Sequence, residues 1–145
     1  MNPDDEVSIT EYQALAEFRY QLRRFLRFSE QAARAAGLEP QQHQLLLALK
    51  GLPQEKKATI GALAERLQIA HHSAVELVDR LAERGLIQRN RGEADQRQVL
   101  LTLTSQGEEV LQKLALAHRA ELRLADSALI QALNTLLTST NDPVH

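Results

Sequence analysis

Two arginines enclose a short polar stretch in the second half of the chain. Arg91 begins the sequence Arg-Gly-Glu-Ala-Asp-Gln-Arg and Arg97 ends it, with Asp95 two positions before Arg97. Guanidinium groups are permanently charged and carry several donors, so they bind phosphate oxygens and are attracted to regions of negative potential. A carboxylate beside them would repel the same anions. We therefore expect Asp95 to pair with an arginine and to hold the shape of the loop.

A second set of polar side chains precedes this loop. Ala74, Leu77, Val78 and Leu81 recur at helical spacing, which predicts one buried stripe. The opposite face of the same helix then presents hydrogen-bonding and contact groups to solvent, namely His71, His72, Ser73, Val75, Glu76 and Arg80.

The elements that must position these groups can be read from the spacing of apolar residues. Ile60, Leu63, Ala64 and Leu67 form the stripe of a preceding short helix, for which Thr59 is the expected N-cap. Gln68-Ile69-Ala70 interrupts the pattern, and Gly85 ends the second helix by adopting a positive φ. Two short helices joined by a tight turn predict a helix-turn-helix.

The period then changes from helix to strand. Leu86–Asn90 is short and extended, and Val99, Leu101 and Leu103 alternate with their neighbours, which predicts two strands joined by the arginine-flanked loop. A helix-turn-helix followed by a β-hairpin is the winged-helix arrangement, with the loop as the wing. The predicted fold class is therefore mainly α, a winged helix-turn-helix flanked by long terminal helices.

This arrangement suggests how the polar groups would act on duplex DNA. A helix fits the major groove, where Ser73 and the histidines can reach base edges or phosphates and Val75 can contact a thymine methyl. Glu76 can accept a hydrogen bond from cytosine N4, although it is unfavourable close to phosphate. Arg80 is placed for phosphate. Arg91 and Arg97 on the wing would approach the narrow minor groove.

The same residues resemble a known family. Leu77-Val78-Asp79-Arg80-Leu81, then Arg84-Gly85-Leu86-Ile87, then Asp95-x-Arg97 with Leu103-Thr104, are similar to the MarR family of winged-helix transcription regulators. The resemblance implies a structural role for Asp95 and a minor-groove role for Arg97. It also implies a homodimer that binds a pseudo-palindromic operator, and release by a small, often aromatic or phenolic, ligand. One departure is the recognition helix, where the family commonly has Arg, Lys, Gln or Thr in place of His71, His72 and Glu76.

Composition narrows the possible functions. The chain of 145 residues has a net charge of −2 and no cysteine, which excludes disulfides and thiolate metal sites. The acidic N-terminus has no apolar core of a signal peptide and no apolar run is long enough to span a membrane, so we expect a cytoplasmic protein. The five histidines are scattered, and no catalytic motif is present. We therefore expect no metal, no cofactor and no enzymatic activity.

Leucine-rich helices are expected on both sides of the winged helix. One should run from about Ser8 to Ala36, a second from Thr104 to about Ala125, and a third should begin at Asp126. Their apolar stripes exceed what one small domain can cover, which usually marks an interface. We predict a helical dimerisation region of residues 1–37 and 104–145 and a DNA-binding domain of residues 38–103. A monomeric helical bundle is the alternative.

Four residues of the first helix are candidates for an effector site, namely Tyr12, Tyr20, Arg24 and Phe28. The competing interpretation is that the aromatic rings pack in a helix–helix core. For the whole chain, the predicted function is a sequence-specific, double-stranded DNA-binding repressor that acts as a homodimer. The alternative is a winged-helix module that binds another protein, which the slightly acidic charge and Glu76 would favour.

Overall fold

The computed structural model describes residues 2, 5–91 and 97–139, and for residues 125–127 and 139 it describes the backbone alone. The chain divides into two compact units. Unit 1 consists of Met1–Ser29 and Ala117–His145, and unit 2 consists of Glu30–Leu116. The two long helices of the chain contribute to both units.

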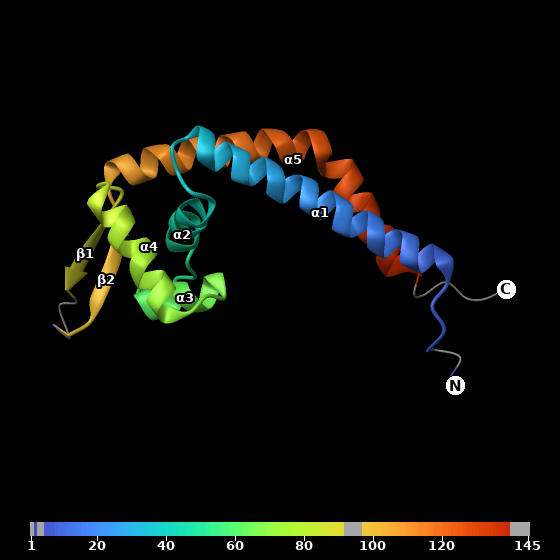
Figure 1. Cartoon of the computed structure of the whole chain (residues 1–145), viewed down its shortest axis with the longest axis horizontal. Coiled ribbons are helices and arrows are strands. Elements are labelled where there is room, and N and C mark those ends of the chain that lie inside the picture. The colour runs from blue at the N-terminus through green and yellow to red at the C-terminus, as the bar shows by residue number, and fades with distance from the viewer. Residues whose placement is uncertain (1, 3–4, 92–96, 140–145) are drawn as a thin grey trace. The chain divides into compact units, whose positions relative to one another are not determined.

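The order of elements is that of a winged helix with a long helix at each end (Figure 1). In chain order these elements are α1 (Ile9–Ala35), α2 (Pro40–Lys50), α3 (Ile60–Leu67), α4 (His71–Glu83), β1 (Ile87–Arg91), β2 (Val99–Leu103) and α5 (Ser105–Ser139). The predicted fold class is confirmed, and the helix-turn-helix consists of α3 and α4.

Local chemistry sets the ends of the two helix-turn-helix helices. The Thr59 hydroxyl accepts a hydrogen bond from the Ala62 N–H at 3.1 Å, which satisfies one free donor at the start of α3. Gln68 ends α3 in the left-handed region, with φ of 55°. Gly85 follows α4 with φ of 73°, a conformation that glycine adopts without a side-chain clash. The predicted N-cap and the predicted stop at Gly85 are confirmed.

Strands β1 and β2 form an antiparallel hairpin in which Ile87 pairs with Leu103 and Arg91 with Val99. Because side chains alternate along a strand, Ile87, Arg89 and Arg91 share one face. Ile87 is 3% exposed, so this face points to the core at its base, and the hairpin contacts α4 through β1 (Figure 1). The Leu101 N–H donates to the Ala58 carbonyl at 2.8 Å, which ties β2 to the segment before α3.

A leucine core holds unit 2 together. The largest fully buried side chains come from four elements and are Leu45, Leu46, Leu63, Val78, Leu81 and Leu101. The stripe predicted for α4 is confirmed, because Ala74, Leu77, Val78 and Leu81 are all buried. Helix α2 buries Leu45, Leu46 and Leu49, whereas Leu47 has 46% of its surface exposed.

The start of α5 is attached to the corner between α4 and β1. The Thr104 hydroxyl donates to the Gly85 carbonyl at 2.6 Å and accepts from the Gly107 N–H at 3.1 Å. The Thr104 N–H donates to the Leu86 carbonyl at 3.1 Å. Gly107 is buried, and a Cβ there would fall far inside contact distance of the Leu86 carbonyl oxygen. Only glycine allows the helix to approach the corner this closely.

Unit 1 contains the first part of α1 and the later part of α5. The His118 ring lies edge-on to Phe25 and Phe28, with centroid distances of 5.9 and 5.3 Å. Its Nε2 lies 2.8 Å from the hydroxyl oxygen of buried Ser29. These contacts join α1 to α5 within the unit. No helix in the described part of the chain is both long enough and apolar enough to cross a membrane.

The prediction of two separate C-terminal helices is wrong. Helix α5 is continuous from Ser105 to Ser139, through Ala125 and Asp126. No glycine or proline occurs after Gly107 within these bounds, and an aspartate in a helix interior costs only a fraction of a kcal/mol, roughly 0.7 relative to alanine. A possible N-cap residue therefore does not start a new helix where nothing ends the previous one.

Gly107→Ala should lower the free energy of unfolding by about 1–3 kcal/mol, because the added methyl group meets backbone that cannot rotate away. The matched control is Gly61→Ala in α3, where the nearest atom to an added Cβ is 3.9 Å away. That change should be neutral or stabilising by up to about 1 kcal/mol. Urea unfolding followed by circular dichroism at one protein concentration measures both. Equal stability of the two variants would contradict the close approach.

Candidate nucleic-acid interface

Helix α4 presents its predicted polar face to solvent. His71, His72, Glu76 and Arg80 are exposed, whereas Ser73 and Val75 are half-buried. His72, Glu76 and Arg80 follow one another at intervals of four residues, so they form one row along the helix. Ala70 is the N-cap and makes no side-chain cap hydrogen bond. The first turn of α4 is therefore open to a partner that can accept hydrogen bonds.

The two wing arginines lie at the far end of the hairpin. Arg91 is the last residue of β1, and Arg97 precedes β2 by two residues, and both are exposed. Arg91 lies on the same strand face as Arg89, the face whose base contacts the core. Asp95 and the rest of residues 92–96 lie outside the described residues, so the expected pairing of Asp95 stays a prediction.

An ion pair between α4 and the wing was not anticipated from the sequence. The Arg89 guanidinium on β1 donates to the Asp79 carboxylate on α4. Both side chains are partly exposed, 40% for Arg89 and 53% for Asp79, so the pair contributes modestly to stability, about 0–1 kcal/mol. Its position matters more, because it connects the polar helix directly to the hairpin. The alternation of side chains along β1 places Arg89 on the same face as buried Ile87, but which residue it pairs with depends on how α4 packs against the strand.

Helix α2 packs against both helices of the helix-turn-helix. Its Gln42 side chain accepts hydrogen bonds from the Glu39 N–H at 3.0 Å and from the Arg84 guanidinium at 3.3 Å. Gln42 is 6% exposed, so these bonds form away from solvent and fix the end of α4 against the start of α2.

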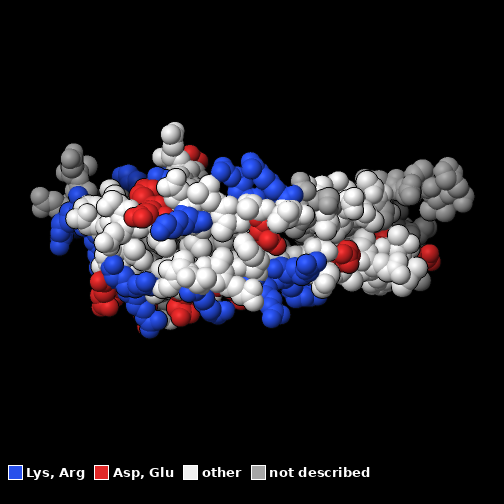
Figure 2. All heavy atoms as spheres, turned by 90° about the horizontal axis from the view of Figure 1, so that it is seen from above, with Lys and Arg blue, Asp and Glu red and all other residues white. Residues whose placement is uncertain are grey.

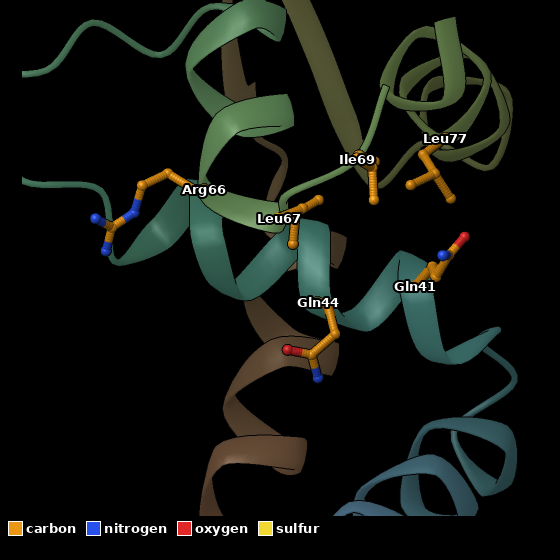
Figure 3. A pocket seen from close by; sticks show the side chains of 6 residues that line it. All are labelled: Gln41, Gln44, Arg66, Leu67, Ile69 and Leu77. Atoms are coloured by element: carbon orange, nitrogen blue, oxygen red, sulfur yellow. The ribbon is translucent and has the colours of Figure 1, made fainter. Parts of the chain in front are cut away.

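A solvent-open hollow of about 350 Å³ lies where α2, α3 and α4 meet (Figure 3). Its floor includes Leu67, Ile69 and Leu77, and Gln41 and Gln44 come from α2. Figure 3 shows Ile69 of the turn and Leu77 of α4 on the side facing Gln41. None of the predicted DNA-contacting side chains lines this hollow, so it belongs to the support of the helix-turn-helix.

The four residues predicted for an effector site all lie in unit 1. Tyr12 and Tyr20 are exposed by 58% and 49%, and the Arg24 guanidinium carbon lies 5.8 Å from the centre of the Tyr20 ring. Phe28 packs on His118, which agrees with the helix–helix role weighed for the aromatic rings. None of the four lines the hollows that the described residues form around α2, α4 and the start of α5.

The site therefore combines an exposed polar helix with an arginine-bearing hairpin that is joined to it by an ion pair. A helix of this kind fits the major groove and a hairpin beside it reaches the backbone or minor groove. Fold and surface together define a winged-helix protein.

A comparison of the sequence with family models finds one match. A sequence model of the MarR family matches residues 36–98, which include α2, both helices of the helix-turn-helix and most of the hairpin. The resemblance to the MarR family noted in the sequence is confirmed over these residues, and the fold is that of a winged helix. A comparison with curated protein sequences finds none that matches the chain.

Solved structures share the fold along most of the chain. A MarR family transcription regulator superposes with a TM-score of 0.72 at 23% identity, covering 90% of this chain and 87% of the other. A mutant of MarR from E. coli, complexed with operator DNA, has a TM-score of 0.64 at 17% identity, covering 83% and 88%. CouR from Rhodococcus jostii RHA1, bound to p-coumaroyl-CoA, has a TM-score of 0.61 at 21% identity, covering 83% and 87%.

The coupling free energy of the Asp79–Arg89 pair can be measured by a double-mutant cycle with Asp79→Ala, Arg89→Ala and the double variant. We expect a coupling free energy of about 0.2–1 kcal/mol at low salt, falling toward zero in about 1 M salt, where exposed charges are screened. Chemical denaturation at the two salt concentrations gives the free energy of unfolding of the wild type, the two single variants and the double variant. Coupling that is absent at low salt, or that is unchanged by salt, would contradict an exposed ion pair between α4 and β1.

Proposed function

We propose that this chain is a sequence-specific, double-stranded DNA-binding transcriptional repressor that acts as a homodimer on a pseudo-palindromic operator. In this proposal residues 38–103 bind DNA, and the helical regions 1–37 and 104–145 join the two copies. The protein works in the cytoplasm, has no enzymatic activity, and leaves its operator when a small ligand binds.

One observation carries the DNA-binding part of the proposal. The face of α4 that the core leaves exposed is polar from His71 to Arg80, and the hairpin attached to it ends in Arg91 and Arg97. His71, His72 and Ser73 would meet bases or phosphates at the start of the helix, with Val75, Glu76 and Arg80 following. The complex of the related MarR with operator DNA supports this assignment.

Exposed apolar side chains of unit 1 support the homodimer. Leu124 is 83% exposed, Leu137 57% and Ile130 52%, all on the later part of α5. After Arg123, the only charged residue of α5 is Asp126. Figure 2 shows mainly uncharged atoms next to the grey terminal residues. An apolar surface of this kind is normally covered, and a second copy of the chain is the proposed cover.

A dimer also fits the geometry of the DNA. Two recognition helices bind successive major grooves when they lie one helical turn apart, roughly 34–36 Å. Because the two copies are related by a two-fold axis, the operator should repeat its half-site in inverted orientation.

For the effector we propose a small aromatic ligand contacting Tyr12, Tyr20, Arg24 and Phe28. The exposed tyrosines offer ring faces, and Arg24 offers a cation for an acidic group. The p-coumaroyl-CoA complex of CouR supports a ligand of aromatic character.

Leu124→Glu and Leu137→Glu should convert the dimer to monomers, because each would place a carboxylate in a desolvated apolar interface. Both side chains are exposed in the single chain, so the folded subunit should persist. The matched control is Leu47→Glu on α2, which is 46% exposed in unit 2 and should leave the dimer intact. Light scattering after size-exclusion chromatography gives the mass. A wild-type monomer at micromolar concentration would refute the dimer.

Arg91→Glu and Arg97→Glu should each weaken operator binding by about tenfold or more and reduce the salt dependence of binding. Each phosphate contact that is lost should lower the slope of log K against log salt by about 0.9. Lys113→Glu on α5 makes the same change of charge at an exposed residue outside the proposed DNA interface and serves as the control, provided that the variant is still a dimer. The operator is first selected from a random duplex pool with the wild-type protein at about 50 mM salt.

Failure of this selection would favour the alternative function. If the wild-type dimer enriches no inverted repeat and binds all duplexes equally, sequence-specific repression is excluded. A winged-helix module for protein binding would then remain, and Arg91→Glu and Arg97→Glu should leave its partner binding largely intact.

A further inference from the structure

We propose that DNA binding by α4 is coupled to proton uptake by His71 and His72, so that the chain binds DNA more tightly as the pH falls from about 8 to about 6. The inference rests on the proposed function, because it concerns how the same helix face meets phosphate. It adds a form of regulation that needs no ligand.

The position of the two imidazoles carries the argument. His71 and His72 are the first two residues of α4 and both are exposed. In a winged helix this first turn is the part of the recognition helix that enters the groove. A phosphate near an imidazole favours its protonated form, and by reciprocity the protonated form favours phosphate.

The charge of the recognition face depends on these two residues. Its other exposed ionisable groups are Glu76, Asp79, Glu83 and Arg80, and Asp79 is neutralised by its ion pair with Arg89. With both imidazoles neutral the remaining groups have a net charge of −1, and with both protonated the net charge is +1. His72 lies one turn before Glu76, so its proton also offsets the carboxylate that would otherwise oppose phosphate.

The charged side chains near α4 do not pair with the two histidines. Helix α4 contacts α2, α3 and β1, and the ionisable residues of these elements are His43, Lys50, Glu65, Arg66, Arg89 and Arg91. Among the described residues, no side chain forms a hydrogen bond or an ion pair with the imidazole of His71 or His72. Asp79 on α4 binds Arg89, and Lys50 binds Glu108 at 2.9 Å.

The other histidines have different surroundings. His43 is buried on α2 with 3% exposure, and His118 contacts Ser29 and two phenylalanine rings in unit 1. His145 lies outside the described residues. Removing only His71 and His72 therefore separates the proposed linkage from any effect of pH on the core or on the helix pair.

The test measures binding of the full chain to a fluorescent duplex of mixed sequence, about 30 base pairs and three helical turns long. Fluorescence anisotropy gives the Kd from about pH 6 to about pH 8 at constant ionic strength. Each proton taken up on binding changes the Kd by up to about tenfold per pH unit. We expect wild-type binding about tenfold or more tighter at the lower pH.

The variant His71→Gln/His72→Gln keeps polar side chains of similar size but cannot be protonated. It should bind with a Kd that is nearly independent of pH. Salt titrations supply a second readout, because each protonated histidine that neutralises a phosphate should steepen the wild-type slope by about 0.9 at low pH only. The control Arg80→Gln should weaken binding at every pH and preserve the pH dependence.

The outcomes separate this inference from the proposed function. Binding that is independent of pH in the wild type, or pH dependence that persists in the double glutamine variant, overturns the inference and leaves DNA binding in place. Absence of binding at every pH overturns the proposed function and the inference with it. Circular dichroism melting of each variant at both pH limits confirms that the fold is retained.

Discussion

The close approach of α5 to the corner after α4 is the constraint on which the winged helix depends. Gly85 turns the chain out of α4, Thr104 bonds to both sides of that turn, and Gly107 lets the new helix lie against the Leu86 carbonyl. The end of the recognition helix, the base of both strands and the start of α5 are thereby held within a few residues of one another.

Electrostatics in this protein are local. The chain has a net charge of −2, and Figure 2 shows basic and acidic side chains interspersed over the visible face. A general attraction to nucleic acid is therefore weak, and the proposed affinity for DNA would have to come from a few placed cations. In the proposal, Arg91 and Arg97 of the hairpin are two of these cations.

The pairing of Asp79 with Arg89 shows how a residue of the family motif acquires a role in this fold. Asp79 would oppose phosphate if it stood alone on the recognition helix. By accepting from Arg89 it loses much of that effect and ties the helix to the hairpin. The pair is partly exposed and contributes little to stability, so its main effect is to restrict the angle between α4 and the hairpin.

Much of the fold was predictable because its signals are local. The apolar stripes of α3 and α4, the Thr59 cap, the stop at Gly85 and the alternating residues of β2 each depend on a few neighbouring residues, and all agree with the structure. The continuous helix α5 was missed because Asp126 was interpreted as a cap, although no residue before it breaks the helix. Which side chains of α4 would be exposed also followed from periodicity, and therefore so did the candidate interface.

By itself, the sequence determined the order of the elements of the winged helix, the apolar stripes of α3 and α4 and the resemblance to the MarR family, since periodicity, caps and motif spacing are properties of contiguous residues. Only the tertiary structure decided that Asp79 faces Arg89, that Gln42 receives Arg84, and that Gly107 must lack a side chain because of Leu86. These contacts join residues distant in the chain, and their geometry follows from how helices and strands pack, which no local pattern encodes.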